Sequence, residues 1–352
     1  MKLKAPVSEE DITSHWIYTD KIYISCVCIT FNQELYIRDA IDSFLAQVTE
    51  YRFEIVIHDD LSTDETRTIL KEYKSKFPSI INLVLQEQNQ YSLGKKIFPI
   101  AVGYTEGEYI ALCEGDDYWN DSNKIDIQYK SMHGKTNISF HPCFYIDQRN
   151  GSVREKCNYY PINELISVNR VLRGGGEFMP TASLMIKKDV FDNLPSWFDN
   201  VPTGDFYLQI LASNEHKALY INELRSSYRY YSVSSWTGEK SNKSKKEIAS
   251  DIAKNVMYLN EVERLVNSDI HEDCSYVFAR IYNNASSLCL SNGYFTEYKE
   301  YIEKSWFYHK YFSRSQTLRY KLKRYPKIVS YISNIVNSNL KIVSRFKGRM
   351  YE

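Results

Sequence analysis

Two groups of acidic side chains follow short apolar segments that favour β-strands. His58-Asp59-Asp60 comes directly after Phe53–Ile57, and Glu114-Gly115-Asp116-Asp117 comes directly after Tyr109–Cys113. Carboxylates that converge repel one another, and Mg²⁺ or Mn²⁺ relieves this repulsion while leaving coordination positions open to phosphate oxygens. The alternative is ordinary turn chemistry, because Asp and Gly are favoured where strands end.

A further acid lies much later in the chain. Asp205 stands in Thr203–Leu208, where a turn precedes an apolar helix start. A carboxylate that arrives from this half could remove the proton of an attacking hydroxyl group, as a general base does. Alternatively, Asp205 caps the helix and accepts a backbone N–H.

The segments around the acids alternate between strand and helix patterns. Apolar runs rich in β-branched residues alternate with helical periodicity at Leu35–Gln47, after Ser62 and near Lys95–Thr105. The expected strands are Ile22–Thr30, Phe53–His58, Ile81–Gln86 and Tyr109–Cys113. This alternation predicts an α/β fold with a mostly parallel sheet, whose binding loops gather at the carboxyl ends of the strands. Both acidic groups would then open onto one crevice.

Beyond Trp119 the alternation weakens, which indicates the α+β half of the same domain. Shorter strands are expected at Ile138–Tyr145, Ala182–Lys187, Ala218–Ile221 and Ser227–Tyr231, with a triple glycine at Gly174–Gly176. A Ser- and Lys-rich stretch near residue 241 precedes helical periodicity. The expected organisation is an N-terminal arm at 1–20, an α/β domain at 21–240 with halves 21–119 and 120–240, a helical region at 241–303 and a basic tail at 304–352.

Composition excludes wholesale disorder, coiled coil and collagen, because 43% of the 352 residues are hydrophobic and 25% are charged. Lys+Arg and Asp+Glu are both 44, but residues 304–352 hold 12 Lys or Arg and one acid, leaving 32 basic and 43 acidic residues before them. An amphipathic cationic helix at Lys327–Phe346 could lie on anionic lipid. Alternatively, it packs on the acidic body or forms a homodimer contact. No nucleic-acid motif accompanies the charge, so no nucleic-acid partner is expected.

No apolar run is long enough to cross a bilayer, and Met1–Asp20 lacks the apolar core of a signal peptide. We therefore expect a cytoplasmic protein, with the tail as a possible peripheral contact on the inner face of the cell membrane. The seven cysteines form no CxxC pair, so we interpret them as reduced thiols.

Several motifs agree in order and context with one known family. Thr30-Phe31-Asn32, the run from His58 to Asp64, and Glu114-Gly115-Asp116-Asp117-Tyr118-Trp119 resemble family-2 glycosyltransferases over about residues 21–238. The resemblance implies a GT-A fold, here with a C-terminal helical extension. It also implies a nucleotide-diphosphate sugar donor, a Mn²⁺ or Mg²⁺ cofactor, and inversion at the anomeric carbon.

The resemblance also suggests the donor-binding residues. Thr30, Phe31 and Asn32 resemble the loop around the nucleoside, with Phe31 in place of a frequent Tyr and able to stack on the base. Asp59 and Asp60 match a pair of which one accepts the uracil N3–H. Asn89, with Lys95 or Lys96, resembles the stretch that approaches the nucleotide and its phosphates, although a later Asn common in that stretch is missing.

The same comparison assigns the reacting groups. Glu114-Gly115-Asp116 resembles a DxD motif with Glu in first place, so Asp116 is expected to ligate the metal, with Glu114 and Asp117 supporting ribose or a metal-bound water. Asp205 matches the general base, although Gly204 replaces the Glu that usually precedes it. Arg229 resembles a residue that pairs with the diphosphate; alternatively it bridges an acid of the body.

These features predict a hexosyltransferase. It would move a hexose from a UDP-sugar to a hydroxyl of a surface glycan, of capsule or lipopolysaccharide type, or of a lipid-linked oligosaccharide. The alternative is a sugar-nucleotide or glycan-binding module without turnover. A nucleotidyltransferase of related fold is a third possibility, but its glycine-rich, basic phosphate loop is absent near the first strand.

Overall fold

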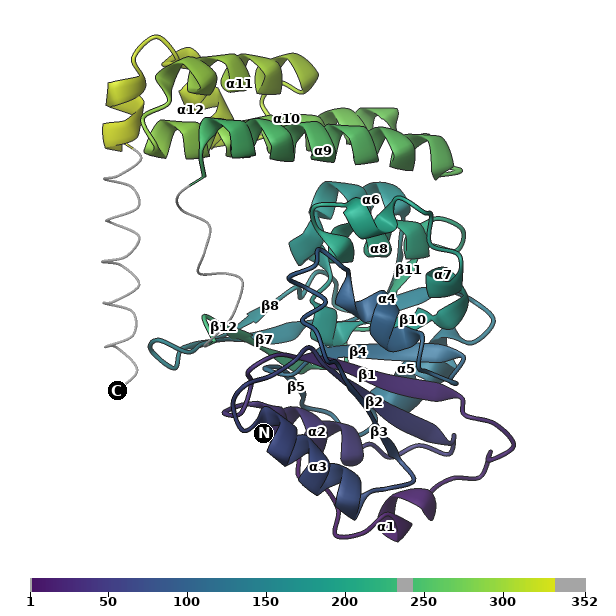
Figure 1. Ribbon diagram of the computed structural model, residues 1–352. Coiled ribbons are helices and arrows are strands. Elements are labelled where there is room, and N and C mark those ends of the chain that lie inside the picture. The colour runs from purple at the N-terminus through teal and green to yellow at the C-terminus, as the bar shows by residue number, and fades with distance from the viewer. Residues whose placement is uncertain (1, 233–242, 333–352) are drawn as a thin grey trace. The chain divides into compact units, whose positions relative to one another are not determined.

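The computed structural model describes residues 2–232 and 243–332. The chain divides into two compact units, Met1–Thr237 and Gly238–Glu352. The first unit is an α/β domain, and the described part of the second is helical (Figure 1). Among the described residues, no helix combines the length and apolarity that crossing a membrane requires.

The described part of the first unit contains two sheets. The larger has eight strands, in the order β3 (Ile81–Leu85), β2 (Phe53–Asp59), β1 (Ile24–Thr30), β4 (Tyr109–Glu114), β10 (Met185–Lys187), β6 (Ile138–Phe140), β11 (Ala218–Tyr220) and β9 (Glu164–Ile166). The smaller has four, in the order β5 (Tyr118–Trp119), β12 (Ser226–Tyr230), β7 (Cys143–Asp147) and β8 (Val153–Lys156).

Helices cover the larger sheet on both faces (Figure 1). The α-helices of the first unit are α1 (Glu10–Thr13), α2 (Ile37–Leu45), α3 (Thr66–Lys76), α4 (Ile97–Val102), α5 (Lys124–Met132), α6 (Val168–Gly174), α7 (Lys188–Asp192) and α8 (Gly204–Ser213). Three short 3₁₀ turns accompany them, namely η1 (Gly176–Phe178), η2 (Thr181–Ser183) and η3 (Phe198–Asn200).

The hydrophobic core lies on both faces of the larger sheet, because successive side chains of a strand point to opposite faces. Alternate residues of β1, β2 and β4, such as Cys26, Ile55 and Ala111, pack with α2, α3 and α5 in one hydrophobic cluster. The intervening residues are buried as well, as Val27 and Val56 show. Strands buried on both faces read as continuous apolar runs, which explains why these strands were predictable from sequence.

The central strands are parallel, as the alternation predicts: β1 pairs with β2 and β4, and β2 pairs with β3. Farther along the sheet, β10 is antiparallel to β4 and to β6. The strand predicted at 138–145 is two strands in different sheets, because the chain turns at His141-Pro142 between β6 and β7.

The second unit packs α9 (Lys245–Leu265), α10 (His271–Ser291), α11 (Phe295–Tyr308) and α12 (Arg314–Lys321). Ser244 and Glu247 form a capping box at the start of α9. The apolar cluster joins Ile248 and Ile252 to Tyr282, Tyr298 and Val329. Residues 326–332 are helical, and the rest of the predicted tail, 333–352, lies outside the described residues.

Candidate active site

The carboxyl ends of β1, β2 and β4 carry the polar residues that the sequence singles out. The strand register places Thr30 beside Asp59 and Ile29 beside Glu114. Thr30 Oγ1 and Asp59 Oδ1 are buried without a hydrogen-bond partner among the described residues. Buried polar atoms normally have partners, so unsatisfied atoms at one sheet edge mark a place where a ligand or water binds.

The second acidic group forms a compact cluster after β4. One carboxylate oxygen from each of Glu114, Asp116 and Asp117 lies within 4.8 Å of the others. Burial, and then the charges of Asp116 and Asp205, raise the pKa of Glu114 to about 8. Burial and the two neighbouring acids also raise the pKa of Asp117 well above its usual value. The cluster therefore favours binding of a proton or a cation.

Gly115 allows this loop to approach the first strand. A Cβ at Gly115 would lie 2.7 Å from Thr30 Oγ1 and 2.9 Å from Thr30 Cβ, closer than a real side chain can come. The Gly115 backbone N–H donates to the Ile29 carbonyl at 2.9 Å. The glycine between Glu114 and Asp116 thus holds the two acids against the end of β1.

Arg229 of β12 holds the acidic loop from the smaller sheet. Its backbone N–H donates to Asp117 Oδ1 at 2.8 Å, and its guanidinium donates to the Asp116 carbonyl and to the Asp39 carboxylate. The guanidinium also lies 4.6 Å from the Tyr118 ring centroid. Arg229 therefore bridges an acid of the body, the alternative that the sequence leaves open, and it fixes the position of Asp116 and Asp117.

Asp205 comes from the later half of the domain, on α8. It is the second residue of α8, whose N-cap is Thr203, so Asp205 is not the capping residue. Asp205 raises the pKa of Glu114, and its Oδ2 lies 3.7 Å from where a Cβ on Gly176 would stand. Asp205 is thus near enough to Glu114 to act on its carboxyl group.

Lys96 reaches the same helix start. A Cβ at Gly204 would lie 3.3 Å from Lys96 Cδ, so the lysine stem passes over the glycine that precedes Asp205. This contact is a physical reason for the missing Glu at position 204, because a longer side chain there would displace Lys96. Lys95 Nζ instead lies 4.0 Å from Asp199 Oδ2, and the side chains of Lys95 and Asp199 are each about half exposed.

Two residues expected around the nucleoside differ in the structure: Phe31 is exposed to solvent, whereas the Asn32 side chain is hydrogen-bonded to a neighbouring loop. Phe31 is 39% exposed, so its ring is open to a ligand. Asn32 has a positive φ of 52°, and its Oδ1 accepts the Thr63 backbone N–H at 2.7 Å. Asn32 thereby ties the loop after β1 to the loop after β2.

Asp59 and Asp60 are both buried, but their surroundings differ. Asp59 pairs with Arg67 Nε at 2.5 Å and keeps its unpartnered Oδ1. Both carboxylate oxygens of Asp60 accept backbone N–H groups, from Gln90 at 2.7 Å and Tyr91 at 2.9 Å. Asp60 therefore anchors the loop after β3.

Asn89 belongs to that same loop. Its Nδ2 donates to the Asp60 carbonyl at 2.9 Å, and its Oδ1 accepts the Ser92 backbone N–H at 2.7 Å. The side chain that was expected near the phosphates thus shapes a turn in the structure.

The acids after β4 have the chemistry of a hard-cation site. Carboxylate oxygens are the ligands that Mg²⁺ and Mn²⁺ prefer. Asp117 Oδ2 is buried without a hydrogen-bond partner among the described residues, whereas Asp116 accepts a hydrogen bond from Ser232. A cluster with elevated pKa values and an unsatisfied oxygen fits a divalent cation.

The family assignment agrees with this geometry. The sequence profile described as glycosyl transferase family 2 matches residues 25–194, which include the strands β1, β2 and β4 and the acids that follow them. The chain carries a family-2 glycosyltransferase domain. Asp205 and Arg229 lie beyond the matched residues.

Two known proteins are similar to this chain in sequence. An uncharacterized protein of Mycobacterium tuberculosis (strain ATCC 25618 / H37Rv) is 33% identical over 219 residues, which cover 60% of this chain and 60% of that protein. The poly(ribitol-phosphate) β-N-acetylglucosaminyltransferase TarS of Staphylococcus aureus (strain Mu50 / ATCC 700699) is 33% identical over 104 residues, which are 29% of this chain and 18% of TarS. The matches thus span less than two thirds of either relative.

A solved structure shows the same fold over a longer stretch. The crystal structure of S. aureus TarS 1-349 in complex with UDP-GlcNAc matches with a TM-score of 0.59 at 15% identity and covers 88% of each chain. The predicted GT-A fold and C-terminal helices are therefore confirmed.

Sequence reasoning missed two residues of the site. Asp39 lies on α2, far from any motif, and pairs with both Arg229 and Lys2. Ser232 donates to Asp116 from just beyond β12. Asp39 lies within a helix, and Ser232 belongs to no recognisable motif, so the sequence carried no signal for them.

Proposed function

We propose that the protein is an inverting glycosyltransferase that moves a hexose from a nucleotide-diphosphate sugar, a UDP-sugar in particular, to a hydroxyl group of a surface glycan or lipid-linked oligosaccharide. The supporting observation is the cluster of Glu114, Asp116 and Asp117 after β4, together with Asp205 of the other half, which is near enough to raise the pKa of Glu114. TarS is a poly(ribitol-phosphate) β-N-acetylglucosaminyltransferase, and its transfer of a sugar to a polymer is consistent with this substrate class.

Each acid has a separate role in this proposal. Asp116 would hold Mn²⁺ or Mg²⁺, with Glu114 and Asp117 completing the acidic side of the site. When bound, the cation neutralises charge on the leaving nucleoside diphosphate. Asp205 takes the proton of the acceptor hydroxyl as the new bond to the anomeric carbon forms and the bond to the diphosphate breaks.

The donor would lie along the carboxyl ends of β1 and β2. Phe31 stacks on the base, and Thr30 and Asn32 line the nucleoside loop. Asp59, with its unpartnered oxygen, is the better placed of the acidic pair to accept a base N–H, while Asp60 and Asn89 shape the loop beside it. Lys95 stays a candidate for binding the phosphates of the donor. Arg229 would act on these phosphates indirectly, because it holds the acidic loop in place.

Two substitutions test these roles. Asp205→Asn should lower transfer by about 100-fold or more while UDP-sugar affinity is retained, since general-base catalysis contributes on this scale. Asp116→Ala should weaken Mn²⁺-dependent UDP binding in calorimetry. Asp192→Asn is the matched control, because Asp192 pairs only with Lys188 at the surface among the described residues. Normal turnover in Asp205→Asn would remove Asp205 from the base role.

A binding module without turnover is the competing function. Incubation with a panel of UDP- and GDP-sugars plus Mn²⁺ separates the two, because a transferase slowly hydrolyses its donor to free nucleoside diphosphate. Release of pyrophosphate instead would indicate a nucleotidyltransferase.

We also propose that the basic tail contacts an anionic membrane surface, where a lipid-linked acceptor would be found. Residues 304–332 contain no acid and expose large hydrophobic side chains, among them Phe307 at 81%, Tyr311 at 68% and Tyr331 at 68%. Cationic segments interleaved with aromatic residues bind anionic lipid interfaces. A homodimer contact is the competing role for the same surface.

A further inference from the structure

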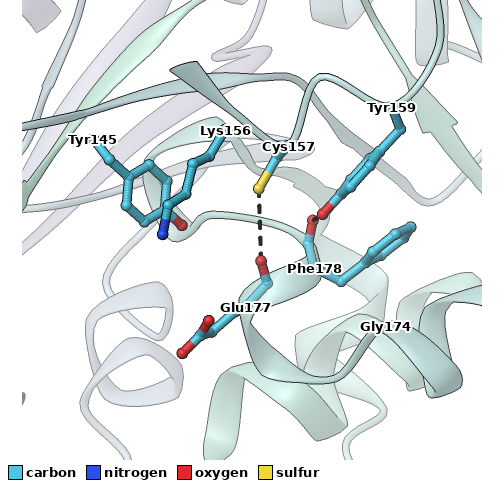
Figure 2. Close-up of a pocket in the computed structure, with 7 residues that line it drawn as sticks. All are labelled: Tyr145, Lys156, Cys157, Tyr159, Gly174, Glu177 and Phe178. Atoms are coloured by element: carbon cyan, nitrogen blue, oxygen red, sulfur yellow. Dashed lines mark hydrogen bonds between the residues drawn. The ribbon is translucent and has the colours of Figure 1, made fainter. Parts of the chain in front are cut away.

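A pocket of about 330 Å³ lies in the later half of the first unit, apart from the acidic cluster. Figure 2 shows Tyr145 and Lys156 on one side, Tyr159 and Phe178 on the other, and Cys157 and Glu177 between them. Strands β7 and β8 supply the first side, and the segment after α6 supplies Glu177 and Phe178. Its volume is at the lower end of the range for small-molecule sites.

The walls of the pocket are tied together by contacts that leave its polar groups available. Tyr159 Oη donates to the Phe178 carbonyl at 3.0 Å, and the two rings stack at 4.7 Å. Cys157 Sγ donates to the Glu177 carbonyl at 3.6 Å, which leaves the Glu177 carboxylate outside this contact. Lys156 Nζ lies 4.4 Å above the Tyr145 ring, and Lys156 forms no salt bridge within residues 2–232 and 243–332.

The triple glycine is part of this construction. A Cβ at Gly174 would lie 2.4 Å from Phe178 Cγ, so only glycine lets the ring pack against the end of α6. Gly175 has a φ of +78°, which glycine adopts without strain. The segment Gly174–Gly176 is therefore fitted to the pocket and not merely a flexible linker.

The pocket adjoins the reacting groups through two of its walls. Gly176, next to the lining residue Glu177, passes close to the Asp205 carboxylate. On the other side, the Tyr145 ring packs at 4.9 Å on the ring of Tyr228. Glu114, Asp117, Asp116 and Glu177 all add to the effect of burial in raising the pKa of Tyr228. Tyr228 thus stands between the acidic cluster and the pocket.

We propose that this pocket binds the sugar unit of the acceptor that carries the attacking hydroxyl group. The proposal rests on the transferase function given above and assigns the acceptor to a pocket next to Asp205. Aromatic rings offer apolar faces to the C–H surfaces of a saccharide, and a carboxylate with an ammonium group accepts and donates hydrogen bonds to its hydroxyls. Glu177 and Lys156 are the two groups of this kind that line the pocket.

Kinetics of two surface variants test the assignment. Glu177→Gln and Lys156→Met keep side-chain size and change exposed residues, so both should fold. Each should raise the acceptor KM by about 10-fold or more with kcat for donor hydrolysis unchanged, because a contact made before the reaction is lost. Glu164→Gln, an exposed acid on β9, is the matched control and should behave as wild type.

Cysteine labelling gives a readout that needs no turnover. Cys157 is the only cysteine of the seven that is not buried, so iodoacetamide should modify it first. A panel of p-nitrophenyl hexosides and N-acetylhexosaminides should contain a member that slows this modification, as followed by mass spectrometry, whereas UDP alone should not.

The outcomes separate the pocket from the proposed function. A wild-type protein that hydrolyses a sugar nucleotide, together with unchanged acceptor KM in both variants, would overturn the pocket assignment and leave the transferase intact. Labelling of Cys157 that stays unaffected by every saccharide serving as an acceptor would do the same. If wild type hydrolyses no sugar nucleotide of the panel, the transferase proposal fails, and this inference fails with it.

Discussion

Among single residues, the acids of the site divide by how many of their oxygens the protein already uses. Asp60 has both oxygens committed to backbone N–H groups, whereas Asp59 and Asp117 each keep one buried oxygen without a hydrogen-bond partner among the described residues. A buried acceptor without a partner costs about 1–3 kcal/mol. A ligand that supplies the missing partner recovers this free energy, so Asp59 and Asp117 are better candidates than Asp60 for direct contact with a ligand.

Lys124 is a buried basic residue at the start of α5. Its side chain is fully buried, donates to Gln128 Oε1 at 2.6 Å and lies 4.3 Å from the Trp119 ring centroid. Burial lowers the pKa of Lys124 to about 8. The titratable groups that interact with it are three thiols and one imidazole: Cys26, Cys113, Cys143 and His141.

This pKa predicts a pH dependence of stability. Below pH 8 both folded and unfolded chains keep the lysine proton; between pH 8 and 10.5 only the unfolded chain does, so the stability contribution of Lys124 rises with pH. Relative to Lys124→Met, the unfolding free energy of wild type should increase by about 3 kcal/mol across this window. Urea unfolding at several pH values measures the difference. Parallel profiles for the two proteins would contradict the prediction.

The acids of the site were predictable from sequence, but the residues that hold them in position were not. Asp59, Glu114 and Asp116 follow buried strands directly, so their meeting at one sheet edge follows from a parallel order of strands. The bridge from Arg229 to Asp39 joins residues 190 positions apart, and no local pattern encodes such a pair. The same holds for Asp60, whose partners are backbone groups of another loop.

Among elements, prediction succeeded where a strand is buried on both faces. Residues 53–58 and 109–113 were found within one residue of β2 and β4. It failed for β5, β8 and β9, because a pair such as Tyr118–Trp119 is too short to show a period and β8 is exposed along its length. The break at His141-Pro142 was missed because both flanking strands are apolar.

The turn before β4 predicts a strong effect of one small substitution. Gly107 donates to Ser25 Oγ, and a Cβ there would lie 2.6 Å from the Ser25 backbone nitrogen. Gly107→Ala must therefore move β4 away from β1 and should cost about 1–3 kcal/mol, as overpacking does. Denaturant unfolding of the full chain measures this loss.

Gly94→Ala is the matched comparison. Gly94 has a φ of +81° and nothing within 4 Å of its added Cβ, so the substitution carries only the conformational cost of about 1 kcal/mol. Equal losses in the two variants would show that the approach to Ser25 is relieved without moving the strands.

Over the whole molecule, charge is distributed unevenly along the chain. Residues 304–352 hold 12 of the 44 basic residues and one of the 44 acids. Five basic side chains among residues 310–332 are exposed, namely Lys310, Arg314, Lys321, Arg324 and Lys327. Each Lys or Arg near an anionic bilayer contributes about 1 kcal/mol of binding.

The full chain should bind phosphatidylglycerol vesicles and not phosphatidylcholine vesicles. Replacing those five residues by Gln should weaken binding by about 100-fold or more in a sedimentation assay, and salt should weaken it as well. Replacing three exposed lysines of α9 and α11 (Lys246, Lys254 and Lys299) is the control. Equal affinity for both kinds of vesicle would exclude the membrane contact and favour the dimer.

The route of the chain between the two sheets has a consequence for protein engineering. Strands β5, β7 and β12 of the smaller sheet each come directly after a strand of the larger one, namely β4, β6 and β11. Exchanging the contiguous segment that holds the smaller sheet for that of a homologue would therefore also replace β6, β9, β10 and β11 of the larger sheet. Altered acceptor choice is better sought by recombining side chains around Glu177 and Tyr145 than by fusing halves of two enzymes.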